Sequence, residues 1–176
     1  MNSVQYPAEL PRAESCYLDA NFLIALGNPV HRKYQDAQTL MKTLLRLKYT
    51  FFLSHLSLAE FWFNSLKLFL RQDGEKRPPA VVLRLEPQKL HPYHSRLDSA
   101  LKRLLQISTM QLIGYPNDHY LPSDALRHGF GAQVLLPFDA FHLEYSLKAR
   151  ARYLVTEDRD FSGVTVPGSQ LEILRY

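Results

Sequence analysis

Cysteine is scarce in this sequence of 176 residues, where Cys16 is the single one. One cysteine excludes an intramolecular disulfide framework and a zinc site built from several thiolates. No apolar run approaches the ~20 residues of a membrane-spanning helix. The first residues contain Pro7, Pro11 and two glutamates where a signal peptide would be continuously apolar. We therefore expect a soluble cytoplasmic protein that has no membrane partner.

Length and composition indicate one folded unit. Hydrophobic residues make up 46% of the chain and charged residues 22%. These values are typical of soluble globular domains and exclude a disordered or fibrous chain. A chain of 176 residues is also close to the usual size of a domain with one buried core. We expect residues 1–176 to form a single domain, with an N-terminal extension over residues 1–14.

Basic residues are concentrated in the middle of the chain. Lysine and arginine number 21 against 17 acidic residues, and residues 61–115 hold nine basic but only four acidic residues. A basic face of this kind can bind phosphate groups. The alternative is that these side chains are the ordinary solvated faces of two helices, and so small an excess favours that alternative when it is taken alone.

Short apolar segments alternate with longer segments of helical periodicity. We expect strands at residues 15–18, 50–53, 110–113, 153–155 and 171–175. We expect helices at residues 21–26, 34–48, 56–70, 97–105 and 138–150. A short helix should also follow Pro122 and end at Gly129 and Gly131. Strands without polar alternation are typical of parallel sheets that helices cover on both faces. The pattern therefore predicts an α/β domain with a mostly parallel sheet.

Residues 72–92 interrupt this alternation. Five residues of this segment prevent one continuous helix: Gly74, Pro78, Pro79, Pro87 and Pro92. Residues 80–85 have the composition of either a short strand or a helical turn. We interpret the segment as a Pro-rich insertion within the domain. The helix before it is apolar nearly all round and needs cover on more than one side, which either a second copy in a homodimer or this insertion would provide.

Four carboxylates fall near the ends of the expected strands. Asp19 follows the first strand and Asp158 follows the fourth. Glu60 lies early in the helix after the second strand, and Asp139 opens the helix before the fourth. Because ligands of parallel sheets bind at the carboxyl ends of the strands, these four side chains can meet at one edge. His142 follows Asp139 by three residues on the same helix, so it lies either beside the acids or in a packed position.

Carboxylates gathered this closely need a counter-charge. Two of them ~4 Å apart repel by ~4 kcal/mol at an effective dielectric constant of ~20, so a divalent cation or a raised pKa must relieve the repulsion. Oxygen ligands without cysteine favour Mg²⁺ or Mn²⁺ over zinc, and such ions activate water for attack on a phosphodiester. Each acid also has an ordinary alternative role, such as a helix cap at Asp19 or a turn residue at Asp158.

Four segments resemble, in chain order, the motifs of the PIN domain family. They read Tyr-Leu-Asp-Ala-Asn-Phe-Leu-Ile over 17–24, Ser-His-Leu-Ser-Leu-Ala-Glu over 54–60, Phe-Asp-Ala-Phe-His-Leu over 138–143 and Leu-Val-Thr-Glu-Asp-Arg-Asp-Phe over 154–161. The last is the most specific, because a strand leads directly into Thr-x-Asp-x-Asp-Phe. The resemblance covers residues 16–176. It implies a three-layer α/β/α sandwich and a metal-dependent ribonuclease, in a family that includes the VapC-type toxins of toxin–antitoxin pairs.

Carried over by position, the resemblance implies a role for each matching residue. The catalytic set would be Asp19, Glu60, Asp139, Asp158 and Asp160, with the first four as ligands of Mg²⁺ or Mn²⁺ and Asp160 as an auxiliary acid. Thr156 would orient the first aspartate, and Asn21 would be the small polar residue that follows it. RNA would be the substrate and an antitoxin protein a partner. The basic residues that we expect to contact RNA phosphates are Lys67, Arg71, Arg96, Lys102 and Arg103.

Two alternatives belong to other classes of function. Haloacid-dehalogenase-like phosphatases also place an aspartate after the first strand, but they need a second aspartate two positions on, where this chain has Asn21. The other alternative is a PIN-like module that binds RNA or protein without cutting. The complete set of acids disfavours it, and a cleavage assay separates it from a nuclease.

Overall fold

The structure is a computed structural model that describes residues 10–114, 121–130 and 135–176. Its centre is a five-stranded sheet with the strand order β3-β2-β1-β4-β5. The strands are β1 (Ser15–Leu18), β2 (Thr50–Ser54), β3 (Met110–Ile113), β4 (Tyr153–Thr156) and β5 (Glu172–Arg175). Each pair of neighbouring strands is parallel, which confirms the α/β class and the parallel sheet that the sequence predicts.

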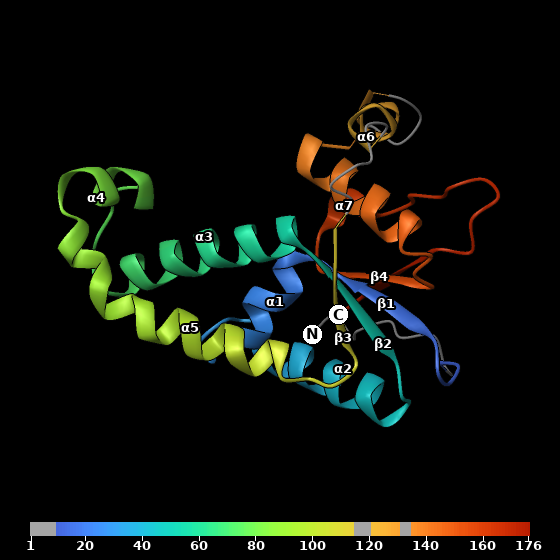
Figure 1. The fold of residues 1–176 in the computed structure, drawn as a ribbon, viewed down its shortest axis with the longest axis horizontal. Helices are drawn as coiled ribbons and strands as arrows, with labels where there is room; N and C mark the ends of the chain where they lie inside the picture. Colours follow the sequence, from blue (N-terminus) through green and yellow to red (C-terminus); the bar gives the residue numbers. More distant parts are fainter. Residues whose placement is uncertain (1–9, 115–120, 131–134) are drawn as a thin grey trace.

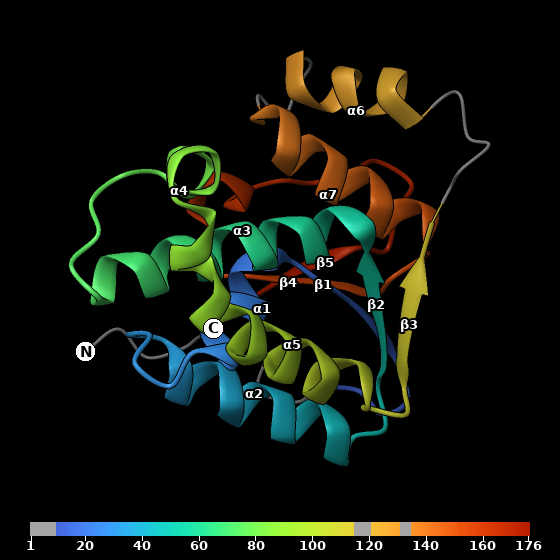
Figure 2. The same ribbon diagram turned by 60° about the vertical axis from the view of Figure 1, so that its left-hand side comes forward.

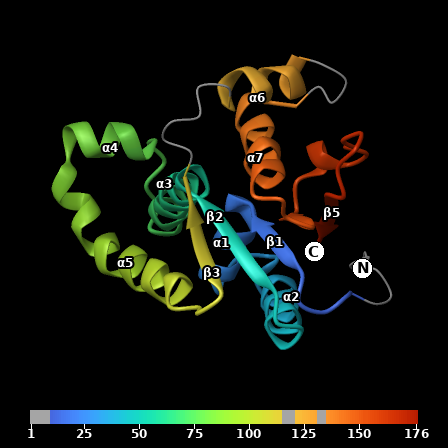
Figure 3. The ribbon, with the colours of Figure 1, turned by 45° about the vertical axis from the view of Figure 1, so that its right-hand side comes forward.

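Helices cover both faces of the sheet (Figure 1 and Figure 2). One face packs against α1 (Ala20–Gly27), α2 (Tyr34–Arg46), α3 (His55–Gln72) and α5 (His91–Leu105), and the other against α7 (Pro137–Lys148). Along β1 the side chains alternate, so that Cys16 and Leu18 enter the first core and Tyr17 the second. Figure 3 shows α6 (Leu121–Phe130) and α7 on the side of the sheet opposite to α2. The three layers are those of an α/β/α sandwich.

Helices α3 and α5 extend beyond the sheet as a pair, and we call residues 55–105 the arm (Figure 1). Between these helices the chain forms α4 (Pro79–Leu85) and the 3₁₀ turn η1 (Pro87–Leu90). Residues 80–85 are therefore helical. Helix α5 starts at His91, earlier than the periodicity from residue 97 predicts. Pro92 permits this early start because it stands in the first turn, where its missing N–H would have no helical partner anyway.

The arm has a small core of its own. The residues that form it are Leu66, Phe69, Leu70, Val82 and Tyr93. The segment between α3 and α5 therefore covers one side of the apolar helix α3. This agrees with the expectation that the insertion, and not only a second copy, would cover that helix. Trp62 and Phe63, also on α3, are 62% and 48% exposed. That remaining apolar surface is consistent with contact to another molecule.

Three further features of the described chain concern Cys16, helix α6 and the lengths of its helices. Cys16 is buried in the core. The short helix expected after Pro122 is α6, which contains Gly129; Gly131, its second expected terminator, lies outside the described residues. In the described part of the chain, no helix is both long and apolar enough to cross a membrane.

Candidate metal centre

The ends of β1 and β4 bring the first two acids together. Asp19 follows β1 directly at the start of α1 and is 3% exposed. Thr156, the last residue of β4, donates a hydrogen bond from Oγ1 to Asp19 Oδ2 (2.7 Å). The same Oγ1 accepts a hydrogen bond from the backbone N–H of Asp158 (3.0 Å). The Thr156 hydroxyl therefore links both acids to one end of the sheet.

Helices α3 and α7 contribute the other two acids. Glu60 lies in the second turn of α3, and Asp139 lies in the first turn of α7, where the helix dipole stabilises a negative charge. One cleft of about 450 Å³ is lined by Asp19, Glu60, Asp139 and Asp158, together with Asn21. Although Asp19 and Asp158 are 139 positions apart in the chain, the fold places all four acids at one edge of the sheet.

The potential ligand atoms of this cleft form two groups. One oxygen from Asp19, one from Glu60 and a ring nitrogen of His142 lie within 4.8 Å of one another. One oxygen from each of Asp139, Asp158 and Asp160 lies within the same distance of the others in its group. The exposed Asp160 thus joins the second group. Asp19, Glu60 and His142 could bind a metal ion.

The acids of the cleft disfavour each other's negative charge. Burial and the carboxylates of Asp158 and Asp19 raise the pKa of Asp139 to about 6. Burial also raises the pKa of Asp19, against the opposing effects of His142 and the hydrogen bond from Thr156. Both carboxyl groups therefore hold a proton more tightly than in water.

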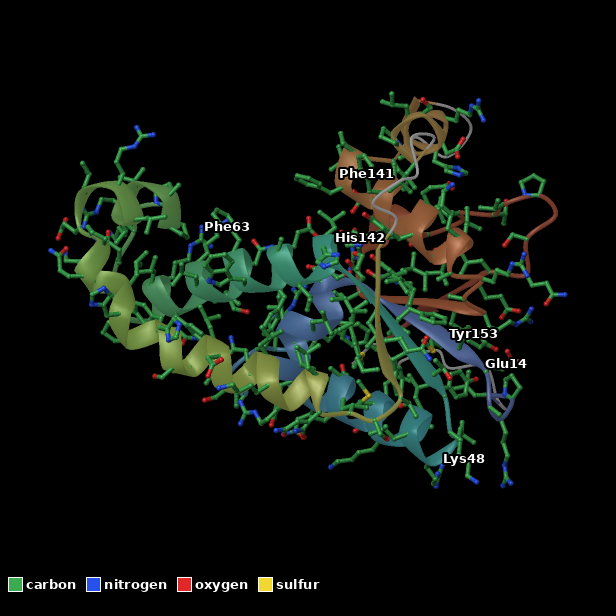
Figure 4. The ribbon with its side chains drawn as sticks, viewed as in Figure 1. Glu14, Lys48, Phe63, Phe141, His142 and Tyr153 are labelled. Carbon is green, nitrogen blue, oxygen red and sulfur yellow. The ribbon has the colours of Figure 1, made fainter. Side chains whose placement is uncertain are left out.

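His142 lies directly beside the acids. Figure 4 shows it between the start of α3 and α7. Its Nε2 is 2.6 Å from Glu60 Oε2 and 3.4 Å from Asp19 Oδ1. Burial alone would lower the pKa of His142, but Asp19 and Glu60 outweigh this and raise it. Of the two positions that the sequence left open, the structure shows the one beside the acidic cluster.

The chemistry of the donors fits Mg²⁺ or Mn²⁺. The cleft presents carboxylate oxygens from four elements and no thiolate, and hard divalent ions prefer oxygen ligands. Burial and the carboxylates of Asp158 and Asp19 raise the pKa of Asp139, and a cation beside these acids would offset the repulsion between them. The residues present therefore fit a divalent cation.

The basic residues expected to contact RNA lie on the arm. Lys67 and Arg71 are on α3, and Arg96, Lys102 and Arg103 are on α5. None of the five is among the described residues that line the acidic cleft. Two of them have partners on the arm itself, since Arg96 lies 3.9 Å from the ring centre of Phe69 and Lys102 pairs with Asp98 at 2.7 Å. Their contact with RNA stays a prediction.

Three residues of this region were not singled out from the sequence. Asn64 lines the cleft one helical turn after Glu60, and that spacing alone would have placed it there. Phe138 also lines the cleft and is 60% exposed, although it precedes Asp139 in a segment that reads as apolar core. Tyr17 lies under the site and bonds to His142 (2.8 Å). In the sequence it is one apolar residue of a buried strand, so no signal marks it.

Comparison with known proteins supports this description. A family model described as the PIN domain matches residues 16–166. The chain is similar in fold to Mycobacterium tuberculosis VapC20, described as a toxin that cleaves the sarcin–ricin loop, with a TM-score of 0.54, 17% identity, and 85% of this chain and 96% of that chain covered. It is also similar to VapBC2 from Rickettsia felis, whose structure contains a promoter DNA fragment, with a TM-score of 0.50, 17% identity and coverages of 90% and 98%. No curated protein matches the chain.

Proposed function

Because this chain belongs to the PIN domain family, we propose that it is a metal-dependent endoribonuclease that hydrolyses phosphodiester bonds of RNA. The observation that carries this proposal is the convergence of Asp19, Glu60, Asp139 and Asp158 on one cleft. Such a convergence is costly for a protein that never binds a cation, because each carboxylate raises the free energy of its charged neighbours. Binding of a metal ion best explains why the cleft contains carboxylates that repel one another.

Each acid has a distinct place in the proposed site. Asp19, Glu60, Asp139 and Asp158 would hold Mg²⁺ or Mn²⁺, and the bound ion would activate a water molecule and stabilise the leaving oxygen. Thr156 keeps the Asp19 carboxylate in one orientation through its 2.7 Å hydrogen bond. Asp160 is exposed beside Asp158, where it can orient a water molecule at the rim.

We also propose that the protein is the toxin of a toxin–antitoxin pair. Its fold is that of VapC20, which is described as a toxin, and of VapBC2. The partner would then be an antitoxin protein. The exposed apolar residues Trp62 and Phe63 on α3 offer contact area for a protein, because large apolar side chains exposed together are typical of interaction sites.

A cleavage assay tests the nuclease. Purified protein is incubated with unstructured and structured RNA in Mg²⁺, in Mn²⁺ or in EDTA. We expect cleavage with either ion and none with EDTA. Asp19→Asn and Asp158→Asn should each abolish cleavage while circular dichroism shows an unchanged fold, since each removes a charged ligand without changing size.

A matched variant and a binding measurement make the assay decisive. Asp98→Asn changes the same type of residue on α5, outside the cleft, and should cut at the wild-type rate. Undiminished cleavage by both cleft variants would show that the activity comes from elsewhere. RNA binding by the wild type without any cleavage would favour the non-catalytic module.

A further inference from the structure

A network of largely buried hydrogen bonds runs beneath the acidic cleft and joins β1, the end of β2, α3 and α7. The hydroxyl of Tyr17, on β1, lies 2.8 Å from Nδ1 of His142, on α7. It also lies 2.7 Å from Ser54 Oγ and 2.9 Å from Ser57 Oγ, at the start of α3. His142 Nε2 is 2.6 Å from Oε2 of Glu60, also on α3. The network therefore links the strand that carries Asp19 to the helix that carries Glu60.

Because the network is buried, any polar atom in it that lacks a hydrogen-bond partner would lower the stability of the fold. Tyr17, Ser54 and Ser57 are 0% exposed and His142 is 1% exposed. A buried polar group without a partner costs ~1–3 kcal/mol, whereas phenylalanine at position 17 would fill the same space without needing a partner. The ring of Tyr17 already packs against Tyr145 (6.5 Å between ring centres), so the hydroxyl group adds only the connections to Ser54, Ser57 and His142.

The direction of the hydrogen bonds assigns the role of His142. A carboxylate only accepts hydrogen bonds, so in the 2.6 Å contact the proton lies on Nε2 and the ring donates to Glu60. A ring nitrogen that carries a proton has no free lone pair for a metal ion. The second ring nitrogen, Nδ1, is occupied by Tyr17. In this arrangement both ring nitrogens of His142 are engaged in hydrogen bonds, and the ring is placed to direct the Glu60 carboxylate.

We propose that His142, held by Tyr17, is a positioning residue that fixes the Glu60 carboxylate beside Asp19 in the geometry that a divalent cation requires. This inference rests on the proposed metal site. Glu60 needs such a support because it is 22% exposed and stands on the long arm helix, while the buried Asp19 is already held by Thr156. Hydrogen bonds from outside the ligand set commonly orient ligands in this way.

The experiment measures binding of Mn²⁺ alone, by calorimetry or by the loss of the free-ion electron paramagnetic resonance signal. His142→Ala removes the donor to Glu60 and should weaken Mn²⁺ affinity by about 10- to 100-fold. His142→Gln restores an N–H near the position of Nε2 and should recover most of that loss. Tyr17→Phe keeps the packing of the ring, removes its hydroxyl, and should weaken affinity by about tenfold, the lower end of that range.

Tyr176→Phe is the matched control for Tyr17→Phe. Tyr176 is 5% exposed, and its hydroxyl has no hydrogen-bond partner in the described part of the chain. Loss of this hydroxyl should leave Mn²⁺ affinity unchanged. A purely structural role of buried tyrosine hydroxyls would instead give both phenylalanine variants the same Mn²⁺ affinity.

Several results would overturn the inference. Equal losses of affinity in His142→Gln and His142→Ala would assign His142 as a direct ligand. Wild-type Mn²⁺ affinity in Tyr17→Phe would contradict the supporting role of Tyr17. If His142→Ala does not fold, the Mn²⁺ affinity of Tyr17→Phe alone tests the inference. Mn²⁺ binding with the expected variant order but no RNA cleavage would contradict the proposed function and leave the inference standing. Absence of Mn²⁺ binding by the wild type would overturn both.

Discussion

The hydroxyl of Thr156 holds the carboxylate of Asp19 across 137 positions of the sequence, with 2.7 Å between Oγ1 and Oδ2. The two residues stand at the ends of the adjacent parallel strands β4 and β1. The same hydroxyl oxygen accepts a hydrogen bond from the backbone of Asp158. One side chain therefore sets the relative positions of two acids of the cleft.

Thr156→Val tests this relationship, since valine keeps the shape and removes the hydroxyl. Hydrogen bonds to charged groups contribute about 1.5–3 kcal/mol, so the free energy of unfolding in urea should fall by about that amount. RNA cleavage should fall at least tenfold, because Asp19 loses its fixed orientation. Thr156→Ser retains the donor and should stay close to the wild type in both measurements. A valine variant that cuts at the wild-type rate would show that Asp19 does not depend on Thr156.

The sequence predicted the sheet and the meeting of the acids for the same physical reason. Apolar strands without polar alternation indicate a parallel sheet, and a parallel sheet brings the carboxyl ends of its strands to one edge. The sequence alone therefore predicts that Asp19 and Asp158 lie at this edge of the sheet. Thr156 entered through the family resemblance, which gave it the role of orienting the first aspartate.

Side-chain directions across several elements could not be predicted in the same way. The position of His142 depends on how α7 packs on β1, and Tyr17 lies in a strand whose pattern shows only that it is buried. The apolar segment at 80–85 is short enough for either a strand or a helix, and the structure shows a helix whose Val82 packs in the arm core. The early start of α5 was hidden by Pro92, because proline both breaks helices and begins them.

The pKa of Asp139 predicts how stability of the metal-free protein depends on pH. Its pKa is raised to about 6, against ~3.9 in an unfolded chain. The folded state therefore binds the proton more tightly, so this group lowers stability above about pH 6 and ceases to do so below about pH 4. Asp139→Asn removes the charge and should raise Tm near pH 7.5, with a difference that shrinks to nothing near pH 4.

Measuring Tm of a second variant in the same buffers tests whether charge repulsion causes the expected rise in Tm of Asp139→Asn. Asp98→Asn alters an exposed aspartate that pairs favourably with Lys102, so it should not raise Tm at either pH. With EDTA present throughout, an increase in Tm for Asp139→Asn that is the same at both pH values would mean that packing and not charge repulsion is relieved.

Binding of Mn²⁺ should offset the loss of folding stability that repulsion among the clustered acids causes. A ligand that binds only the folded state at 100 times its Kd stabilises it by about 2.7 kcal/mol, so Tm of the wild type should rise with Mn²⁺ and fall back when EDTA is added. Asp158→Asn should lose most of this rise, and Asp98→Asn should keep it. Equal responses of all three proteins would place the bound ion outside the cleft.

A stripe along α3 defines where RNA should approach the site. Glu60 and Asn64 line the cleft, and Lys67 and Arg71 follow at helical spacing on the same side of α3. With a rise of ~1.5 Å per residue, Lys67 stands roughly 10 Å and Arg71 roughly 16 Å from Glu60 along the helix axis. An acidic site repels a polyanion, so basic residues leading away from it are the expected contacts of a bound strand.

Double replacement of Lys67 and Arg71 by alanine should therefore weaken binding of single-stranded RNA and flatten its dependence on salt. Each lost phosphate contact lowers the slope of log K against log salt by about 0.7 for a single strand, so the pair should reduce it by about 1.4. Lys42→Ala with Arg46→Ala removes the same charge from the exposed surface of α2 and should leave the slope near its wild-type value, because α2 does not line the cleft. Equal slopes for the two double variants would mean that Lys67 and Arg71 act only through net charge, and that the strand enters along another path.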